Sequence, residues 1–204
     1  MTLININVIF AILAAYLFGS IPWALVVGKL FYKTDVRQFG SGNLGASNAG
    51  RVLGKWAGVS VTILDALKAC FVVLLCASFI PSATILAGLA CCFGHCFPIF
   101  ANFKGGKAVA TTFGYFLGIG IVTGHLLTIF VLPVCSFFVI LYICKMVSLS
   151  SIIAIGIETV ASFFAQPDLV ISLSFVALFL FVTYRHKSNL QRIKDGEEKK
   201  ITWM

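Results

Sequence analysis

Seven long apolar stretches separated by short polar segments constrain the fold of this chain more than any other feature. The stretches cover roughly residues 3–31, 59–80, 83–100, 108–122, 125–143, 149–165 and 169–184. They are continuously apolar without period-two alternation, which favours membrane helices over the strands of a barrel. Because 60% of the 204 residues are hydrophobic and only 11% are charged, a soluble domain could not cover so much apolar surface. We therefore expect an all-α integral membrane protein of about seven transmembrane helices, forming a single membrane-embedded domain over residues 1–204.

The placement of Lys and Arg predicts the orientation of these helices. Basic residues follow the first, third, fifth and seventh stretches, whereas the N-terminus and the alternate connections contain none. Cytoplasmic loops carry the excess of Lys and Arg in membrane proteins. This rule predicts an N-terminus outside and a C-terminus in the cytoplasm. It also accounts for the net charge of +8 without a nucleic-acid partner.

The first basic segment reads GSGNLGASNAGR over residues 40–51 and matches the G-x-G-x-x-G pattern. Dinucleotide binding requires a preceding strand and a βαβ unit, and an apolar helix precedes the segment here, so we reject it. Glycines still allow successive backbone N–H groups to converge on an anion. The alternative interpretation is a flexible polar loop rich in turn residues. The candidate anion ligands are Gly40, Ser41, Gly42, Asn43, Ser47, Asn48 and Arg51.

The second basic segment contains Lys104, Gly105, Gly106 and Lys107, directly before the stretch that begins near residue 108. Glycines at the N-terminus of a helix expose unpaired N–H groups to an anion. A Walker A loop is rejected, because its first glycine and its Ser/Thr position are both occupied by alanine. The alternative is a basic helix end that only follows the positive-inside rule.

The third segment, residues 185–198, leaves the last apolar stretch and contains His186 and Asn189. His186 is a candidate general base or phosphate ligand. The alternative is a solvated basic tail. Ser148, close to Lys145 at the start of the sixth stretch, is a candidate pocket-lining residue or a helix cap.

Four further polar residues lie within apolar stretches. Asp65 and Lys68 stand three residues apart on one helix face, and a charge pair in a membrane span is costly unless it is satisfied. We expect a structural or site-lining role for this pair. His95 is either a functional group or a packed core residue, and the sequence assigns no role to Glu158.

Three glycine-, amide- or base-rich segments on one membrane face predict an anion-binding pocket against the lipid. This indicates an enzyme that joins a water-soluble phosphate compound to a lipidic one. Two other classes fit the composition: an organophosphate transporter, and a membrane protein that binds anionic lipid heads. The chain lacks an H-x-x-x-x-D box, a G-x-S-x-G elbow and a metal-binding cluster of His and Cys.

Five motifs occur in order along nearly the whole chain: GSIPWALVVGK, GSGNLGASNAGR, GHCFPIFANFKGGKAVAT, SLSSI and YRHKSNLQRIKDGEE. In these motifs the chain closely resembles the bacterial acyl-phosphate:glycerol-3-phosphate acyltransferase family (PlsY). Two departures are mild: Ser47 stands where the family usually has Thr, and Ala69 where it usually has Gly. The resemblance implies a seven-helix enzyme of the bacterial inner membrane, with an active site facing the cytoplasm.

The resemblance also implies the reaction. A fatty acyl group would pass from acyl-phosphate to the sn-1 hydroxyl of glycerol 3-phosphate, giving lysophosphatidic acid and phosphate in the first acylation of phospholipid synthesis. The implied partners are acyl-phosphate, glycerol 3-phosphate and membrane lipids, with no nucleic acid, cofactor or metal, and we expect a monomer. The implied catalytic residues are Ser41, Arg51, Lys104, His186 and Asn189. The implied substrate-binding residues are Gly40, Gly42, Asn43, Ser47, Asn48, Gly105, Gly106, Lys107, Ser148 and Glu197.

Overall fold

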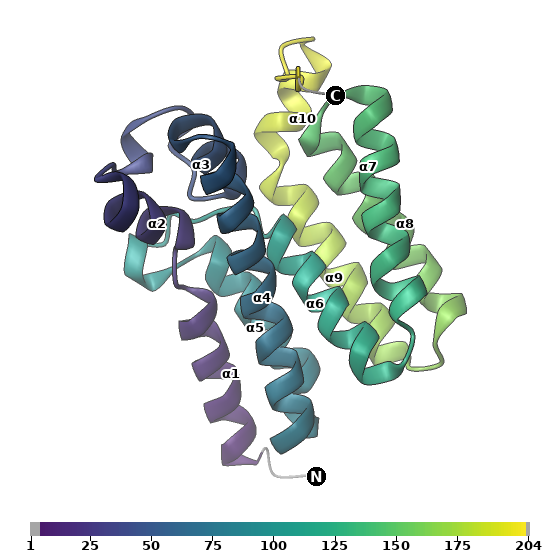
Figure 1. Cartoon of the computed structure of the whole chain (residues 1–204). Helices are drawn as coiled ribbons and strands as arrows, with labels where there is room; N and C mark the ends of the chain where they lie inside the picture. The colour runs from purple at the N-terminus through teal and green to yellow at the C-terminus, as the bar shows by residue number, and fades with distance from the viewer. Residues whose placement is uncertain (1–4, 203–204) are drawn as a thin grey trace. The chain divides into compact units, whose positions relative to one another are not determined.

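A computed structural model describes residues 5–202 of the chain. Within these residues every regular element is a helix, and no strand is present (Figure 1). The chain divides into two compact units, Met1–Gly118 and Ile119–Met204, and each is described here by itself. The prediction of an all-α protein is confirmed.

The first unit contains five α-helices, three short 3-10 turns and the beginning of a sixth α-helix that runs past its boundary. Asn5 caps the first helix, because its side chain accepts a hydrogen bond of 3.0 Å from the backbone N–H of Asn7. The elements are α1 (Ile6–Gly19), α2 (Trp23–Tyr32), η1 (Val36–Gln38), α3 (Ala46–Leu53), α4 (Lys55–Phe79), η2 (Pro81–Ala83), α5 (Thr84–Cys96), η3 (Ile99–Ala101) and α6 (Val109–Thr123).

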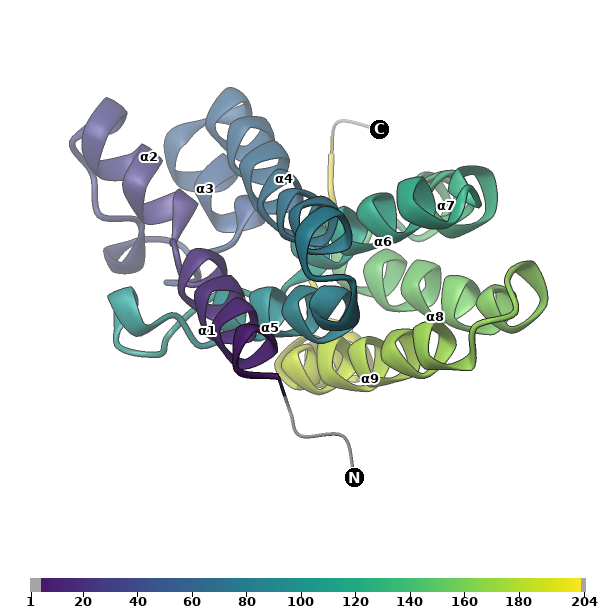
Figure 2. The ribbon, with the colours of Figure 1, turned by 90° about the horizontal axis from the view of Figure 1, so that it is seen from below.

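Small residues let the helices of this unit approach closely. Helix α1 lies along α5, as both views of the ribbon show (Figures 1 and 2). A Cβ atom on Gly19 would overlap the backbone of Cys91, and one on Gly94 would overlap the carbonyl of Tyr16. The Tyr16 hydroxyl then donates to the carbonyl of Phe97 at 2.9 Å. Close backbone contact of this kind, rather than burial from water, holds helices together in lipid.

An apolar core supports α3 and the loop before it. Helix α3 lies on the start of α4, where a Cβ atom on Gly58 would come within 2.8 Å of Gly50 Cα. This close approach buries the apolar side of the short helix against α2, η1 and α4. The buried members of the core are Ala24, Leu25, Val27, Val36, Leu44, Ala49, Ala57, Val61 and Ala101.

The second unit is built around α8, which packs against both of its neighbours in sequence (Figure 2). A polar contact closes the α8–α9 connection: the Gln166 amide donates to the Ser172 hydroxyl at 2.7 Å and to the carbonyl of Asp168 at 2.9 Å. Asp168 caps α9 by accepting from the N–H of Val170. The elements are η4 (Leu127–Val131, a π-helical turn), α7 (Leu132–Cys144), α8 (Val147–Ala165), α9 (Leu169–Arg185) and α10 (Lys187–Lys194).

Each of the seven apolar stretches of the sequence coincides with one or more helices, apart from residues 3 and 4 of the first stretch, which lie outside the described residues. Among residues 5–202, four helical stretches are long and apolar enough to cross a membrane: Lys55–Phe79, Pro81–Ala101, Leu127–Cys144 and Val147–Ala165. Two bent pairs, α1 with α2 (41°) and α9 with α10 (59°), bring the number to as many as six if each pair is one span. Helix α6 is apolar but shorter, with 15 residues.

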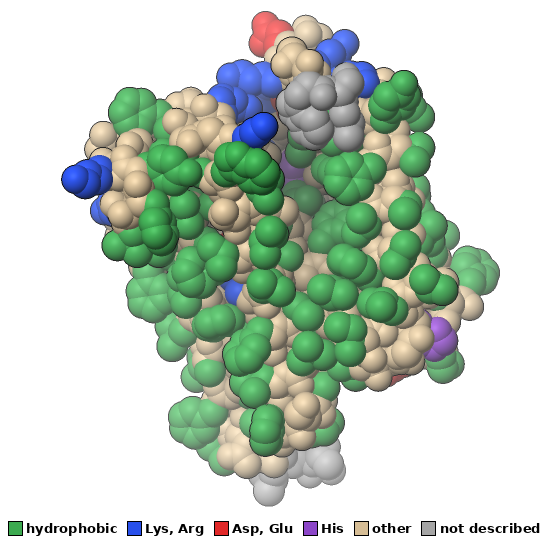
Figure 3. Space-filling model, in the orientation of Figure 1, with side chains coloured by type: hydrophobic (Ala, Val, Ile, Leu, Met, Phe, Trp, Pro, Cys, Tyr) green, Lys and Arg blue, Asp and Glu red, His purple; other side chains and the backbone are tan. Residues whose placement is uncertain are grey.

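The surface agrees with a lipid environment. Hydrophobic side chains cover the visible flanks of the helices in each unit, whereas most Lys and Arg side chains in view lie near helix ends (Figure 3). Exposed side chains along the flanks include Phe10, Ile63, Phe71, Phe138 and Phe164, the last 87% exposed. An apolar surface of this extent is typical of a protein that faces acyl chains.

Candidate functional site

In the first unit, Asn48 organises the loop that contains Ser41. Asn48 is buried on α3, and its Oδ1 accepts from the Ser41 backbone N–H at 2.8 Å and from the Ser41 hydroxyl at 3.1 Å. Its Nδ2 donates to the carbonyls of Val36 at 2.9 Å and Phe39 at 3.3 Å. Both ends of the amide are therefore used inside the protein. Asn48 shapes the loop around Ser41.

Two glycines give this loop its curvature. Gly40 and Gly42 have φ angles of 64° and 66°, in the left-handed region that favours glycine. Asn43 forms a further tight turn by accepting from the N–H of Gly45 at 3.1 Å. The resulting curl leaves the side chains of Ser41 and Ser47 exposed, together with Arg51 in the last turn of α3.

The Lys104–Lys107 segment lies directly on the last turn of α5. The N–H groups of Gly105 and Gly106 donate to the carbonyls of Cys96 and His95, both at 3.1 Å. A Cβ atom on Gly105 would overlap the His95 carbonyl, and one on Gly106 would overlap Nε2 of the His95 ring. Glycine is therefore required here by close approach, while Lys104 stays exposed.

This geometry corrects one detail of the sequence interpretation. The two glycines were expected to offer their N–H groups to an anion, but both groups already donate to carbonyls of α5. The reason is that α6 begins at Val109, so that Gly105 and Gly106 precede the first turn of the helix. Of the two lysines of this segment, Lys104 is exposed and Lys107 is half-buried.

In the second unit, a carboxylate connects three polar side chains. Oε1 of Glu198 accepts from the Ser148 hydroxyl at 2.6 Å and from the Asn189 amide at 2.5 Å, and Oε2 accepts from Arg192 at 2.8 Å. Burial opposes ionisation of Glu198, but these three hydrogen bonds outweigh it and hold the pKa below its ordinary value. We call Ser148, Asn189, Arg192 and Glu198 the Glu198 cluster.

The C-terminal segment reaches this position by folding back on the start of α8. Gly196 adopts a φ of 75° after α10, and the N–H of Ile201 donates to the carbonyl of Lys145 at 2.8 Å. A backbone contact and the Glu198 cluster therefore attach the same segment to the α7–α8 connection.

His186 lies at the junction of α9 and α10 and is only 3% exposed. Its Nδ1 is 2.8 Å from the carbonyl oxygen of Val182. Because a carbonyl can only accept, Nδ1 carries the proton of this hydrogen bond. In the neutral ring the lone pair is then on Nε2, which is the arrangement that a general base needs.

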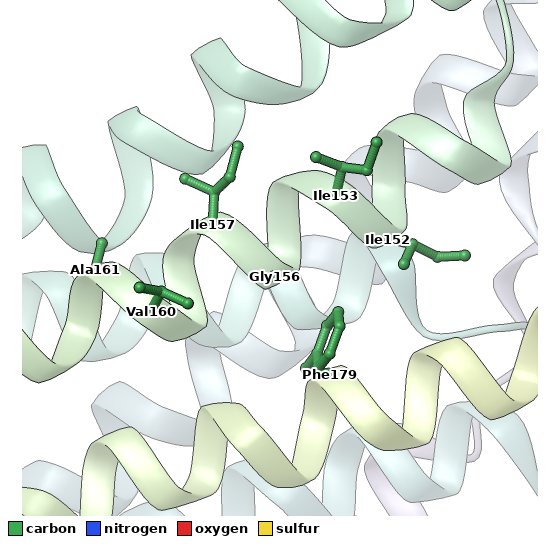
Figure 4. Close-up of a pocket in the computed structure, with 7 residues that line it drawn as sticks. All are labelled: Ile152, Ile153, Gly156, Ile157, Val160, Ala161 and Phe179. Atoms are coloured by element: carbon green, nitrogen blue, oxygen red, sulfur yellow. The ribbon is translucent and has the colours of Figure 1, made fainter.

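An apolar groove runs along α8 in the same unit (Figure 4). It has a volume of about 610 Å³, and Phe179 of α9 closes one side of it. Ile152, at one end of the groove, is one helical turn after Ser148 and so shares its face of α8. The lining residues are Ile152, Ile153, Gly156, Ile157, Val160, Ala161 and Phe179.

The glycerol-3-phosphate acyltransferase family model matches residues 9–196. The chain belongs to this family. The glycerol-3-phosphate acyltransferase of Listeria welshimeri serovar 6b is 44% identical over 204 residues, which cover 98% of this chain and 100% of that protein.

Two solved structures support the assignment to the glycerol-3-phosphate acyltransferase family. A crystal structure of PlsY, an integral membrane glycerol 3-phosphate acyltransferase, in its glycerol 3-phosphate form aligns with a TM-score of 0.87 and 32% identity, covering 96% of each chain. The lysophosphatidic acid form of PlsY aligns with a TM-score of 0.85 at the same identity and coverage. The sequence-based assignment to an integral membrane acyltransferase that uses glycerol 3-phosphate is confirmed.

Within the described residues 5–202, no group of three or more His, Cys, Asp and Glu side chains could hold a metal ion. The sequence-predicted residues fall in both units: the Ser41 loop, Arg51 and the Lys104–Lys107 segment in the first, and Ser148, His186 and Asn189 in the second. The expectation that all three polar segments share one pocket stays a prediction.

Sequence reasoning missed Glu198 and named its neighbour Glu197. The structure leaves Glu197 exposed, whereas the Glu198 side chain is 7% exposed at the centre of its cluster. A substrate-binding role for Glu197 stays a prediction. Asn189 and Arg192, one turn apart on α10, mark the helix face that the carboxylate meets. The sequence could not show which glutamate contacts that face, because the chain leaves helical geometry at Gly196 and the residues after it no longer follow helical spacing.

We expect Glu198→Gln to loosen the C-terminal segment at neutral pH by roughly 1–2 kcal/mol, because it removes a charged acceptor from three donors. Hydrogen exchange of residues 187–202 measures the effect, with Glu197→Gln as the matched control. The folded-state pKa of Glu198 is lowered, so its stabilisation is present above the ordinary value of 4.5 and is lost as the pH falls through the folded pKa. The variant and the native protein should therefore converge in acid. Equal effects of the two substitutions at neutral pH would contradict the cluster.

Proposed function

We propose that this protein transfers a fatty acyl group from acyl-phosphate to the sn-1 hydroxyl of glycerol 3-phosphate at the inner membrane of a bacterium. The observation that carries the proposal is the match to PlsY in its glycerol 3-phosphate form over 96% of both chains. The products are lysophosphatidic acid and inorganic phosphate. The reaction needs no group beyond the two substrates and the side chains of the protein.

The chemistry asks mainly for positioning and charge neutralisation. An acyl-phosphate is a mixed anhydride with a good leaving group, so holding the two substrates together supplies much of the acceleration. The hydroxyl oxygen attacks the acyl carbonyl carbon, the bond between that carbon and the phosphate oxygen breaks, and phosphate leaves. The proton of the hydroxyl passes to His186 or to a phosphate oxygen of the substrate. Cations near the phosphates stabilise the charge that develops on the leaving group.

Residues of the first unit bind phosphate in this proposal. Ser41 turns its hydroxyl from Asn48 to the anion, beside the backbone of Gly40, and Asn43 and Ser47 complete the curl. The N–H of Gly42 donates to the Phe39 carbonyl at 3.0 Å, so Gly42 shapes the loop rather than donating to the anion. Asn48 acts by holding Ser41, since its own amide is used inside the protein. Arg51, Lys104 and Lys107 provide charge-assisted contacts to phosphate oxygens, and Gly105 and Gly106 keep the two lysines in place.

Residues of the second unit bind the acceptor. His186 is a base or a ligand for glycerol 3-phosphate, and its Nδ1 contact with Val182 orients the ring. Asn189 and Ser148 are held by the Glu198 carboxylate, which fixes their rotamers before substrate arrives. Pre-organised polar groups of this kind lose little entropy when they bind a ligand.

The groove along α8 is the proposed binding site of the acyl chain. It is wholly apolar, it opens to the lipid-facing surface, and it begins one turn from Ser148. Ile152 to Ala161 spans ten residues of helix, and the nine rises between them amount to roughly 14 Å. An acyl chain can enter such a groove laterally from the bilayer.

We further propose seven membrane spans with the N-terminus outside and the C-terminus in the cytoplasm. The bent pairs α1–α2 and α9–α10 would each begin in the membrane and end at its cytoplasmic surface, and α6 would be a short span. The placement of Lys and Arg supports this orientation. It puts residues 40–51, 103–111 and 185–198 on the cytoplasmic side. We propose one catalytic domain that acts as a monomer.

Purified protein should produce lysophosphatidic acid from acyl-phosphate and glycerol 3-phosphate, and none from acyl-CoA. The kinetics should be sequential, because the acyl group passes directly between substrates and Ser41 serves as an anion ligand.

We expect Ser41→Ala to lower kcat/KM by about tenfold, the effect of losing roughly 1.4 kcal/mol of phosphate contact, while the fold persists. Initial rates over both substrate concentrations measure this. Ping-pong kinetics, or an acyl group on Ser41 detected by mass spectrometry, would refute direct transfer.

Arg51→Ala and Lys104→Ala should each cost at least about 2 kcal/mol of transition-state stabilisation, or roughly 30-fold in kcat/KM, because each removes a charge-assisted contact. Lys199→Ala, in the exposed C-terminal segment, is the matched control and should be nearly silent. Equal losses in all three variants would mean that the basic segments act only as a diffuse positive field.

Gly156→Leu should shift the donor preference toward shorter acyl chains. A Cβ atom on Gly156 would already lie 3.0 Å from the Phe179 ring, so a larger side chain obstructs the groove. We expect kcat/KM to fall by about tenfold for a sixteen-carbon donor and much less for an eight-carbon donor. Phe164→Leu, an exposed position on α8 outside the groove, is the control. An equal loss of kcat/KM for donors of all chain lengths would contradict the groove as the binding site of the acyl chain.

A further inference from the structure

Two opposite charges are buried one turn apart in α4. Asp65 and Lys68 are 1% and 2% exposed, and Lys68 Nζ lies 2.8 Å from Oδ1 of Asp65. Buried charges in a membrane span are expensive and persist only when partners inside the protein satisfy them. The neighbours of this pair therefore show what it is for.

The ammonium of Lys68 has three hydrogen-bond partners on three different elements. It contacts Oδ1 of Asp65 at 2.8 Å, Nδ1 of His95 at 2.9 Å and the carbonyl oxygen of Ile21 at 3.3 Å. An ammonium carries three N–H donors, so this set matches its capacity. Nδ1 of His95 also lies 3.2 Å from Oδ1 of Asp65. Because Nδ1 accepts from Lys68, it has no proton to donate to the carboxylate, and the Lys68 ammonium is the group that joins the two side chains.

The third partner belongs to the break between α1 and α2. Leu25 donates its N–H to the carbonyl of Pro22 at 2.8 Å rather than to that of Ile21. The Ile21 carbonyl is thus released by the break, and Lys68 satisfies it inside the protein. The pair in α4 thereby connects the bend of the first two helices to the end of α5.

The other edge of the His95 ring supports the Lys104–Lys107 segment. Gly106 lies against Nε2 so closely that no Cβ would fit, and its N–H donates to the His95 carbonyl at 3.1 Å. The position of the His95 ring therefore limits the positions that Gly105 and Gly106 can occupy. Lys104 and Lys107 flank those glycines directly in the sequence.

We propose that Asp65, Lys68 and His95 form a brace that sets the position of the Lys104–Lys107 segment. In this α4 brace the three side chains are positioning residues, because they act on substrate through the lysines. The inference rests on the proposed function, in which Lys104 and Lys107 hold a substrate phosphate. It gives the two charges inside the membrane a role beyond helix packing.

Two variants test the α4 brace from opposite sides. Asp65→Asn with Lys68→Met removes both charges together, which avoids the uncompensated buried charge that either single change would leave. His95→Ala keeps the Asp65–Lys68 pair and removes the ring, with its contacts to Lys68 Nζ and to Gly106. The matched control is Glu158→Gln, which replaces a buried carboxyl of α8 in the second unit with an amide of similar size.

Two measurements on the full-length protein in detergent separate positioning from stability. We expect hydrogen exchange of the peptide containing Gly105 and Gly106 to accelerate by about tenfold or more in both brace variants. The KM for at least one phosphate-bearing substrate should rise by about tenfold, with a smaller change in kcat. The thermal midpoint should stay within about 4 °C of the native value. Glu158→Gln should change neither the exchange nor the KM.

Unchanged exchange and unchanged KM in the brace variants would overturn the proposal. Activity that falls only in proportion to the amount of folded protein would overturn it as well, because that is the result of a purely structural role. The exchange measurement does not depend on turnover. If the native protein transferred no acyl group, the proposed function would fail, while the effect of the brace on Gly105 and Gly106 would still be tested.

Discussion

A lysine inside a membrane helix must find all of its hydrogen-bond partners within the protein, and the first unit is arranged around this requirement at Lys68. Its ammonium joins Asp65 on the same helix, His95 at the end of α5 and the Ile21 carbonyl at the α1–α2 break. Water cannot replace any of these contacts in the lipid phase. The contacts of this one buried ammonium therefore connect the α1–α2 bend to the end of α5, against which the Lys104–Lys107 segment packs.

The second unit uses a carboxylate in a similar way. Glu198 accepts hydrogen bonds from Ser148 of α8 and from Asn189 and Arg192 of α10, and it thereby attaches the C-terminal segment to the start of α8. In both units the charged group at the centre of the network holds other residues in position. Of the side chains proposed to meet substrate, Ser41 is held by the buried amide of Asn48, and Asn189 by the Glu198 carboxylate.

This arrangement suits a reaction whose donor is already activated. Acyl transfer from a mixed anhydride demands that two anionic substrates be held together and that the leaving phosphate be stabilised, rather than that a nucleophile be created. In the proposed mechanism, the cations of the first unit, a curled glycine loop and a histidine with an oriented ring supply those functions. The apolar groove along α8 is the proposed binding site of the acyl chain.

The sequence by itself determined the all-helical fold class, the apolar stretches that form helices, and the family, because continuous apolar runs and long motifs are local properties of a chain. It also identified Ser41, Arg51 and Lys104 as candidate ligands. Only the tertiary structure decided that Asn48 and the N–H groups of Gly105 and Gly106 are used internally, and that Glu198 rather than Glu197 joins the polar cluster. The contact between Ser148 and Glu198 spans 50 positions of the sequence. Hydrogen-bond partners so far apart in the sequence depend on how the helices pack, and local residue patterns do not specify that packing.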